Sequence, residues 1–153
     1  MIKVSIDVNA PASVFYDVVV DYEKYPEFLK DLKKVTIIKT EGNAKTVHHD
    51  AEIIKPMWYD LVLVEEEKNR KLSWKLIDSS TVSIAFFKIK LIEKNDGWWD
   101  IIETAPGKCT ATYNLDIVLN SKIPAALTEP VVKKNLPATM AAFKARAESL
   151  AKN

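Results

Sequence analysis

The chain contains two histidines, His48 and His49, which are adjacent and are the side chains best suited to acid–base chemistry near neutral pH. Both fall in an alternating stretch typical of a β-strand, where neighbouring side chains point to opposite faces of the sheet. They therefore cannot act as a pair on one substrate. His49 shares its face with Val47, Ala51 and Ile53 and is predicted to reach the interior. There it either bonds to a tyrosine or to the backbone, or contacts a ligand carbonyl or hydroxyl.

Other familiar catalytic and metal-binding patterns are missing from the sequence. His48-His49-Asp50 does not place enough ligands on one face for zinc, and there is no cysteine pair to complete a site. The single cysteine, Cys109, excludes an intramolecular disulfide and lies in an alternating stretch typical of a buried, inert thiol. Three separated glycines cannot form a phosphate-binding loop, and no nucleophile elbow occurs. The sequence therefore predicts no metal, no cofactor and no catalytic residue set.

The composition is that of an ordinary globular protein. Of 153 residues, 48% are hydrophobic and 28% are charged, with a net charge of +1 from 22 basic and 21 acidic side chains. This balance gives no electrostatic reason to expect nucleic acid as a direct partner. The N-terminus does not resemble a secretory signal, and no segment approaches the roughly 20 apolar residues that span a bilayer. We expect one domain over residues 1–153, located in the cytoplasm, with no stable membrane insertion.

The stretch from Ala10 to Phe28 predicts a short, broken pair of helices after one strand-like segment. Pro11 suits a first helical turn, because its missing N–H would be unpaired there. One apolar helix face follows, at spacings of three and four: Phe15, Val18, Val19 and Tyr22. Tyr25-Pro26 then breaks the helix, since the residue before a proline disfavours helical backbone. A second short helical turn is predicted over Glu27–Leu32.

The middle of the chain alternates in the manner of an antiparallel sheet. All three glycines stand at predicted hairpin turns: Glu41-Gly42-Asn43, Asp96-Gly97 and Pro106-Gly107-Lys108. Alternating apolar and polar residues between these turns predict about six or seven strands. The last strand has a long apolar face: Cys109, Ala111, Tyr113, Leu115, Ile117 and Leu119. Ser79–Ala85 is more polar than its neighbours and is predicted as a bulge or a longer connection.

The C-terminal stretch changes to a helical period. Its apolar residues step by four, three, four and three: Leu136, Met140, Phe143, Ala147 and Leu150. Pro137 cannot donate a hydrogen bond to the carbonyl of Lys133, so a break or kink is predicted around Asn135–Pro137. The sequence thus predicts an α+β fold, in which one long helix lies against one long sheet.

This order of elements resembles the START-like, helix-grip superfamily (SRPBCC), and within it the polyketide cyclase/dehydrase branch. The chain is most similar to proteins of the coenzyme Q-binding type and the ribosome-association toxin type. The matching residues are Ala10-Pro11-Ala12, Val14-Phe15, Asp21-Tyr22, Tyr25-Pro26-Glu27-Phe28-Leu29, Trp74, Gly97-Trp98-Trp99, Thr112-Tyr113-Asn114-Leu115, Leu136-Pro137 and Met140-Ala141-Ala142-Phe143. A single tryptophan is usual where Trp98 and Trp99 stand, and the sequence leaves open which of the two points inward.

The resemblance implies a curved sheet wrapped around the C-terminal helix, with an apolar cavity between them. The predicted ligand-binding residues point into that space: His49, Trp74, Phe87, Ile89, Tyr113, Leu115, Met140 and Phe143. A dry void of about 300 Å³ would cost on the order of 7 kcal/mol, so side chains, water or an apolar guest must fill it. The same residues could instead form an ordinary closed core.

Three functions remain open at this point. The first is binding or carrying of a hydrophobic small molecule, such as an isoprenoid quinone, a lipid or a polyketide-like compound. The second is an enzyme of the cyclase, aromatase or dehydratase type, in which His49, Tyr113 or Tyr59 moves protons. The third, implied by the toxin-type relatives, is a module that binds a protein partner through its surface.

Overall fold

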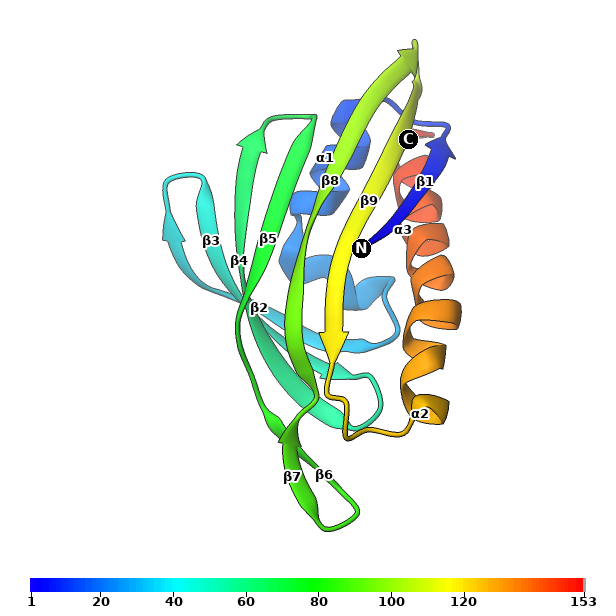
Figure 1. Cartoon of the computed structure of the whole chain (residues 1–153). Coiled ribbons are helices and arrows are strands. Elements are labelled where there is room, and N and C mark those ends of the chain that lie inside the picture. Colours follow the sequence, from blue (N-terminus) through cyan, green and yellow to red (C-terminus); the bar gives the residue numbers. More distant parts are fainter. Residues whose placement is uncertain (153) are drawn as a thin grey trace.

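The long antiparallel sheet of this protein curves around its C-terminal helix. A computed structural model describes residues 1–152, and seven strands in this range form one sheet in the order β1-β9-β8-β5-β4-β3-β2. The strands are β1 (Ile2–Val8), β2 (Leu32–Glu41), β3 (Ala44–Glu52), β4 (Pro56–Glu67), β5 (Lys71–Ser79), β8 (Ile92–Ala105) and β9 (Lys108–Leu119). Helices α1 (Ala12–Val20) and α3 (Leu136–Ala151) both lie against its inner face (Figure 1). The predicted α+β helix-grip architecture is confirmed.

The first helical region is broken as predicted, but at a different place. Helix α1 ends at Val20, and a 3₁₀-helix, η1, follows over Tyr22–Glu27 with Pro26 inside it. The expected turn over Glu27–Leu32 was therefore placed too late. Three residues make one turn of a 3₁₀-helix, so Tyr22 and Tyr25 fall on the same side. Both are buried, with ring centroids 6.0 Å apart, and this burial fixes the position of the turn.

Two of the three predicted glycine turns are confirmed, and the third is wrong. Gly42 and Gly107 have positive φ angles in the β2–β3 and β8–β9 turns. Gly97, by contrast, lies inside the continuous strand β8. A Cβ atom at this position would stand 2.2 Å from the backbone oxygen of Asn114 and 2.6 Å from the ring of Trp74. Gly97 is therefore a packing requirement, because the indole of Trp74 lies directly on the strand.

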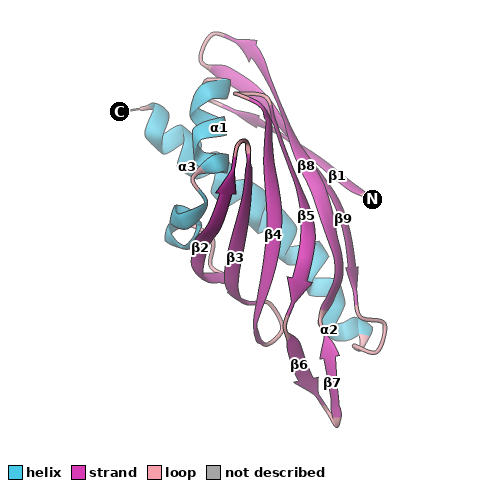
Figure 2. Ribbon diagram, turned by 90° about the vertical axis from the view of Figure 1, so that its left-hand side faces the viewer, coloured by secondary structure: helices cyan, strands magenta, loops and turns pink. Residues whose placement is uncertain are grey.

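The polar connection after β5 forms a small separate hairpin. Strands β6 (Thr81–Ile84) and β7 (Phe87–Lys90) pair only with each other and project beyond the main sheet (Figure 2). Alternation in Phe87–Leu91 had predicted a strand with an inward-facing Phe87, but Phe87 is 58% exposed. Ile89 is buried in a second apolar cluster at the base of this hairpin.

The C-terminal helix carries the irregularity predicted from Pro137. The short helix α2 (Ala125–Pro130) continues into a π-helical turn, η2 (Val131–Asn135), which leads directly into α3. The missing N–H of Pro137 explains why regular helical hydrogen bonding is interrupted just before it. Of the predicted apolar stripe, Leu136, Met140, Phe143 and Ala147 are buried, whereas Leu150 is exposed.

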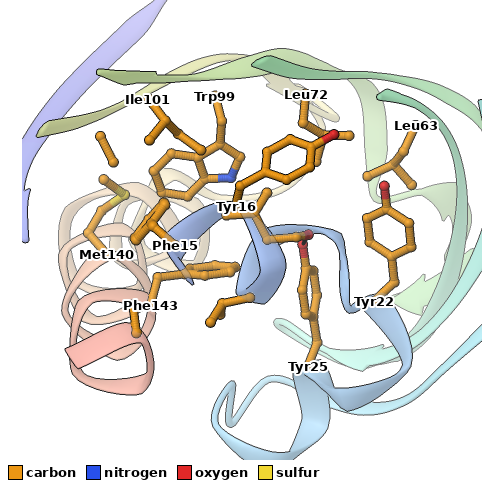
Figure 3. Close-up of a cluster of buried hydrophobic side chains, with 14 of the residues drawn as sticks. Phe15, Tyr16, Tyr22, Tyr25, Leu63, Leu72, Trp99, Ile101, Met140 and Phe143 are labelled. Atoms are coloured by element: carbon orange, nitrogen blue, oxygen red, sulfur yellow. Dashed lines mark hydrogen bonds between the residues drawn. The ribbon is translucent and has the colours of Figure 1, made fainter. Parts of the chain in front are cut away.

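An aromatic cluster joins the two long helices to the sheet. The ring of Trp99 on β8 lies 5.2 Å from that of Phe15 on α1 and 5.3 Å from that of Phe143 on α3, both edge-on (Figure 3). Phe143 also meets Tyr25 edge-on at 5.4 Å. Trp99 is buried, so of the adjacent pair it is Trp99 that points inward. Trp98 is partly exposed and has the Lys71 ammonium 5.9 Å from its ring.

Gly97→Ala should destabilise the protein severely, because the added methyl group would overlap backbone and indole atoms. We expect a loss of about 3 kcal/mol or more in the free energy of unfolding, measured by urea denaturation. Gly42→Ala is the control: open space surrounds its position, and only its positive φ opposes the change, at about 1 kcal/mol. Equal losses for the two variants would contradict the packing role of Gly97.

Candidate functional site

A cavity of about 670 Å³ lies between the sheet and the first half of α3. Strands β3, β4, β5, β8 and β9 form one wall, and the helical stretch from Val131 to Phe143 forms the opposite one. Tyr25–Leu32 closes the side between them. Lys30, Ala138 and Ala141 belong to the wall and are also exposed, so the cavity opens to solvent between this segment and α3.

The sheet side of the cavity is an aromatic surface held in place by few polar contacts. The ring of Tyr113 lies 5.2 Å from that of Trp74 and 4.8 Å from that of Trp99. The indole N–H of Trp74 donates a 3.0 Å hydrogen bond to the side-chain oxygen of Asn95. Because Gly97 supports the same indole from below, Trp74 has little freedom to turn. This wall is therefore built before any ligand arrives.

His49 is a buried polar side chain in the cavity wall. Its ring stacks on that of Tyr59, with centroids 4.5 Å apart and planes within 9°. Within residues 1–152, no group lies within hydrogen-bonding geometry of its Nδ1 atom. Burial lowers the pKa of His49 to about 4, although nearby backbone groups of Tyr59 and Val47 favour the proton. The imidazole is thus neutral at physiological pH and retains an unused capacity to form hydrogen bonds.

Three tyrosines place further phenol groups in the wall. The hydroxyl of Tyr25 donates a short hydrogen bond to the backbone oxygen of Val19. Burial raises the pKa of Tyr25, Tyr59 and Tyr113 well above the ordinary value of 10.0. All three phenols therefore keep their protons at any physiological pH and can act only as neutral hydrogen-bonding groups.

Five of the eight predicted site residues lie in the cavity wall: His49, Trp74, Tyr113, Leu115 and Phe143. The other three lie elsewhere. Phe87 and Ile89 belong to the separate β6–β7 hairpin, which does not follow the curve of the main sheet. Met140 is buried on the closed side of the interior, near Phe15 and Ile101 (Figure 3). Since α3 is packed on more than one side, a single apolar stripe does not separate cavity residues from core residues.

Sequence reasoning missed the polar and small residues of the wall. Asn95 lies in a polar stretch that reads as part of a turn, and Asn135 and Thr139 lie on the helix side of the cavity. The alanines at 138, 141 and 142 were equally inconspicuous, yet they leave the space that larger residues would fill. The three alanines at 138, 141 and 142, close in sequence to Phe143, were the available signal.

The curved sheet, the long helix and the cavity between them define a START-like helix-grip fold. A START superfamily protein from Mycobacterium smegmatis matches with a TM-score of 0.80 and 17% identity, over 97% of both chains. The Zhui aromatase/cyclase from Streptomyces sp. R1128 matches at 0.79 and 15%, over 96% of this chain and 92% of that one. The di-domain ARO/CYC BexL from the BE-7585A biosynthetic pathway matches at 0.71 and 20%, over 99% of this chain and 50% of that one.

The chain belongs to the family described as polyketide cyclase / dehydrase and lipid transport, whose model matches residues 8–144. Among curated protein sequences, none matches it significantly. Within residues 1–152, no helix has the length and the apolar character that crossing a membrane requires.

The buried His49 should make the protein less stable in mild acid. Its pKa is about 4 in the folded chain, against an ordinary value of 6.5, so the unfolded chain binds the proton more readily. Above pH 6.5 His49 is neutral in both states, and its protonation does not lower the free energy of unfolding. As the pH falls towards 4, proton uptake by the unfolded chain should lower the free energy of unfolding by about 3 kcal/mol. Urea denaturation at several pH values should show a smaller loss over this window for His49→Leu than for the wild type. Parallel curves for the two proteins would contradict a neutral, buried His49.

Proposed function

We propose that the protein binds a hydrophobic small molecule in the cavity between its sheet and α3. The observation that supports this most strongly is the combination of size, opening and wall chemistry. About 670 Å³ is within the range of small-molecule sites, and the wall is mainly aromatic and aliphatic. Family membership supports the same class of ligand. An isoprenoid quinone, a lipid or a polyketide-like compound fits this description.

Burial of apolar surface supplies the affinity. A guest that buries about 300 Å² of apolar surface gains roughly 7 kcal/mol before ordering costs are subtracted. Water is a poor alternative occupant, because a water molecule needs several polar partners and this wall offers few. The flat rings of Trp74, Trp99 and Tyr113 favour a planar or ring-bearing guest.

His49 supplies a polar contact that orients the guest. A neutral imidazole can donate a hydrogen bond to a carbonyl or accept one from a hydroxyl. His49 is buried, lies in the cavity wall and stacks on Tyr59, so its imidazole is held in one orientation. A ligand oxygen within reach of this imidazole would form a hydrogen bond in a largely apolar surrounding. The preferred ligand therefore carries one oxygen function on an otherwise apolar body.

Enzymatic cyclisation or dehydration is the second candidate, and the tyrosines favour it. Protonated phenols of Tyr59 and Tyr113 in the wall could polarise a ligand carbonyl. The low pKa of His49 argues against a role in proton abstraction, because a base with a pKa of about 4 is weak at neutral pH. Binding without turnover is therefore the function that the site supports best.

A titration with acetylnaphthalene, followed by quenching of tryptophan fluorescence, tests the cavity directly. Ala142→Trp adds a large ring to the helix side of the wall and should weaken binding about tenfold or more. Ala145→Trp is the matched control, since Ala145 is exposed on the same helix and is not part of the wall. Equal affinities of the two variants would place the binding site outside the cavity.

The same titration with ethylnaphthalene, which lacks the carbonyl, tests the contact with His49. The wild type should prefer the ketone by roughly fivefold to tenfold, as expected for one buried hydrogen bond. His49→Leu should bind both compounds with similar affinity. A preference that survives this substitution would exclude His49 as the polar contact.

A further inference from the structure

The β6–β7 hairpin presents aromatic side chains to solvent at its tip. Phe86 is fully exposed and Phe87 is 58% exposed. Both views of the molecule show this hairpin projecting past the end of the main sheet, on the same end as α2 (Figures 1 and 2). A fully exposed phenylalanine on a projecting hairpin is unusual, since large apolar side chains gain free energy by leaving water.

The turn that carries Phe86 departs from ordinary turn chemistry. Ile84 pairs with Phe87, so the loop consists of Ala85 and Phe86 alone. Ala85 has a φ of 54°, in the region that glycine and asparagine favour. Backbone geometry does not favour alanine at position 85, where φ is positive, and solubility does not favour a fully exposed phenylalanine at position 86. Their presence points to a contact made by the tip itself.

Lysine side chains lie beside the aromatic tip. The hairpin contains Lys88 and Lys90 and no acidic residue in its sequence from Thr81 to Lys90. Lys122, in the loop before α2, holds its ammonium 5.7 Å from the centre of the Phe87 ring. Further along the sequence, η2 contains Lys133 and Lys134, and the preceding helix α2 contains one acid, Glu129. Two of these lysines face a carboxylate, since Lys90 contacts Asp78 and Lys133 lies 3.6 Å from Glu129.

The base of the hairpin is packed against one end of the cavity. The second apolar cluster contains Val82 and Ile89 of the hairpin, with Leu32 and Ile53 packed against it. Leu32 and Ile53 also line the cavity. In addition, Asn120 donates hydrogen bonds to the backbone oxygens of Lys90 and Leu91 and so ties the hairpin base to the loop before α2. The base of the hairpin therefore adjoins one end of the cavity.

We propose that the β6–β7 hairpin docks the protein on the surface of an anionic lipid bilayer. Aromatic rings insert at the level of the headgroups, and the lysines beside them attract the negative surface. A partner protein fits less well, because a stable interface buries roughly 800 Å² on each side and this narrow hairpin offers a small tip. This docking proposal is independent of the proposed function, because it does not require that the cavity holds a ligand.

Flotation with lipid vesicles tests the proposal, using phosphatidylcholine with phosphatidylglycerol and, separately, phosphatidylcholine alone. The wild type should float with the anionic vesicles, and added salt should weaken the binding. Phe86→Asp should lower the partition coefficient at least tenfold, and Lys88→Glu about fivefold or more. The controls are Ile102→Asp on β8 and Lys108→Glu at the start of β9, where both residues are exposed. These two variants should bind as the wild type does.

Three results would overturn the proposal: no binding to anionic vesicles, equal binding to both kinds of vesicle, or unchanged binding of Phe86→Asp. Sedimentation equilibrium should show a monomer in solution. A dimer that Phe86→Asp dissociates, without vesicle binding, would make the tip a contact between copies instead. Phe86→Asp should keep its affinity for acetylnaphthalene, so failure of ligand binding and failure of docking are recorded by separate assays.

Discussion

The edge-on contacts of Phe143 and Phe15 with Trp99 lie between the packed part of the interior and the cavity. They fix α3 and α1 to the same strand of the sheet, so the sheet has to curve around both helices. On one side of this contact, α1 and Tyr22 of η1 pack into the main apolar cluster. On the other side, α3 faces the sheet across the cavity and presents small residues such as Ala138 and Ala142 to it. One helix with small side chains cannot fill the concave face of a long sheet, and a cavity results.

The wall of the cavity is rigid because each large ring in it has a separate support. Trp74 rests on Gly97 and donates to Asn95, while His49 stacks on Tyr59. Burial favours the neutral forms of His49, Tyr59 and Tyr113, so the proposed ligand would be selected by shape and by one polar contact with the wall. Under this proposal, the site would prefer a ligand with a ring that fits the aromatic wall and an oxygen that reaches His49. Chemistry on the bound ligand would need a stronger base than this wall provides.

Periodicity in the sequence was sufficient to predict the long elements and insufficient for the short ones. Strand β9 and helix α3 follow their patterns over many residues, so the fold and five wall residues could be predicted. A strand was predicted from the alternation in Phe87–Leu91, but the tight turn of the β6–β7 hairpin was missed because Ala85 adopts the positive φ that a glycine would have signalled. The turn predicted at Gly97 was wrong because this glycine is required by close packing and not by a turn. The ring of Trp74, which is distant in sequence, leaves no room for a Cβ atom there. The Nδ1 atom of His49 without a partner is a tertiary property that no local pattern contains.

The central claim is that the cavity holds an apolar guest, and native mass spectrometry of the freshly purified protein tests it most directly. The structure predicts a complex of one apolar small molecule per chain, which solvent extraction would release for identification. It also predicts that the extracted molecule carries an oxygen function on a largely apolar body. A ligand-free mass, together with no uptake from a panel of quinones, lipids and aromatic polyketides, would contradict the claim.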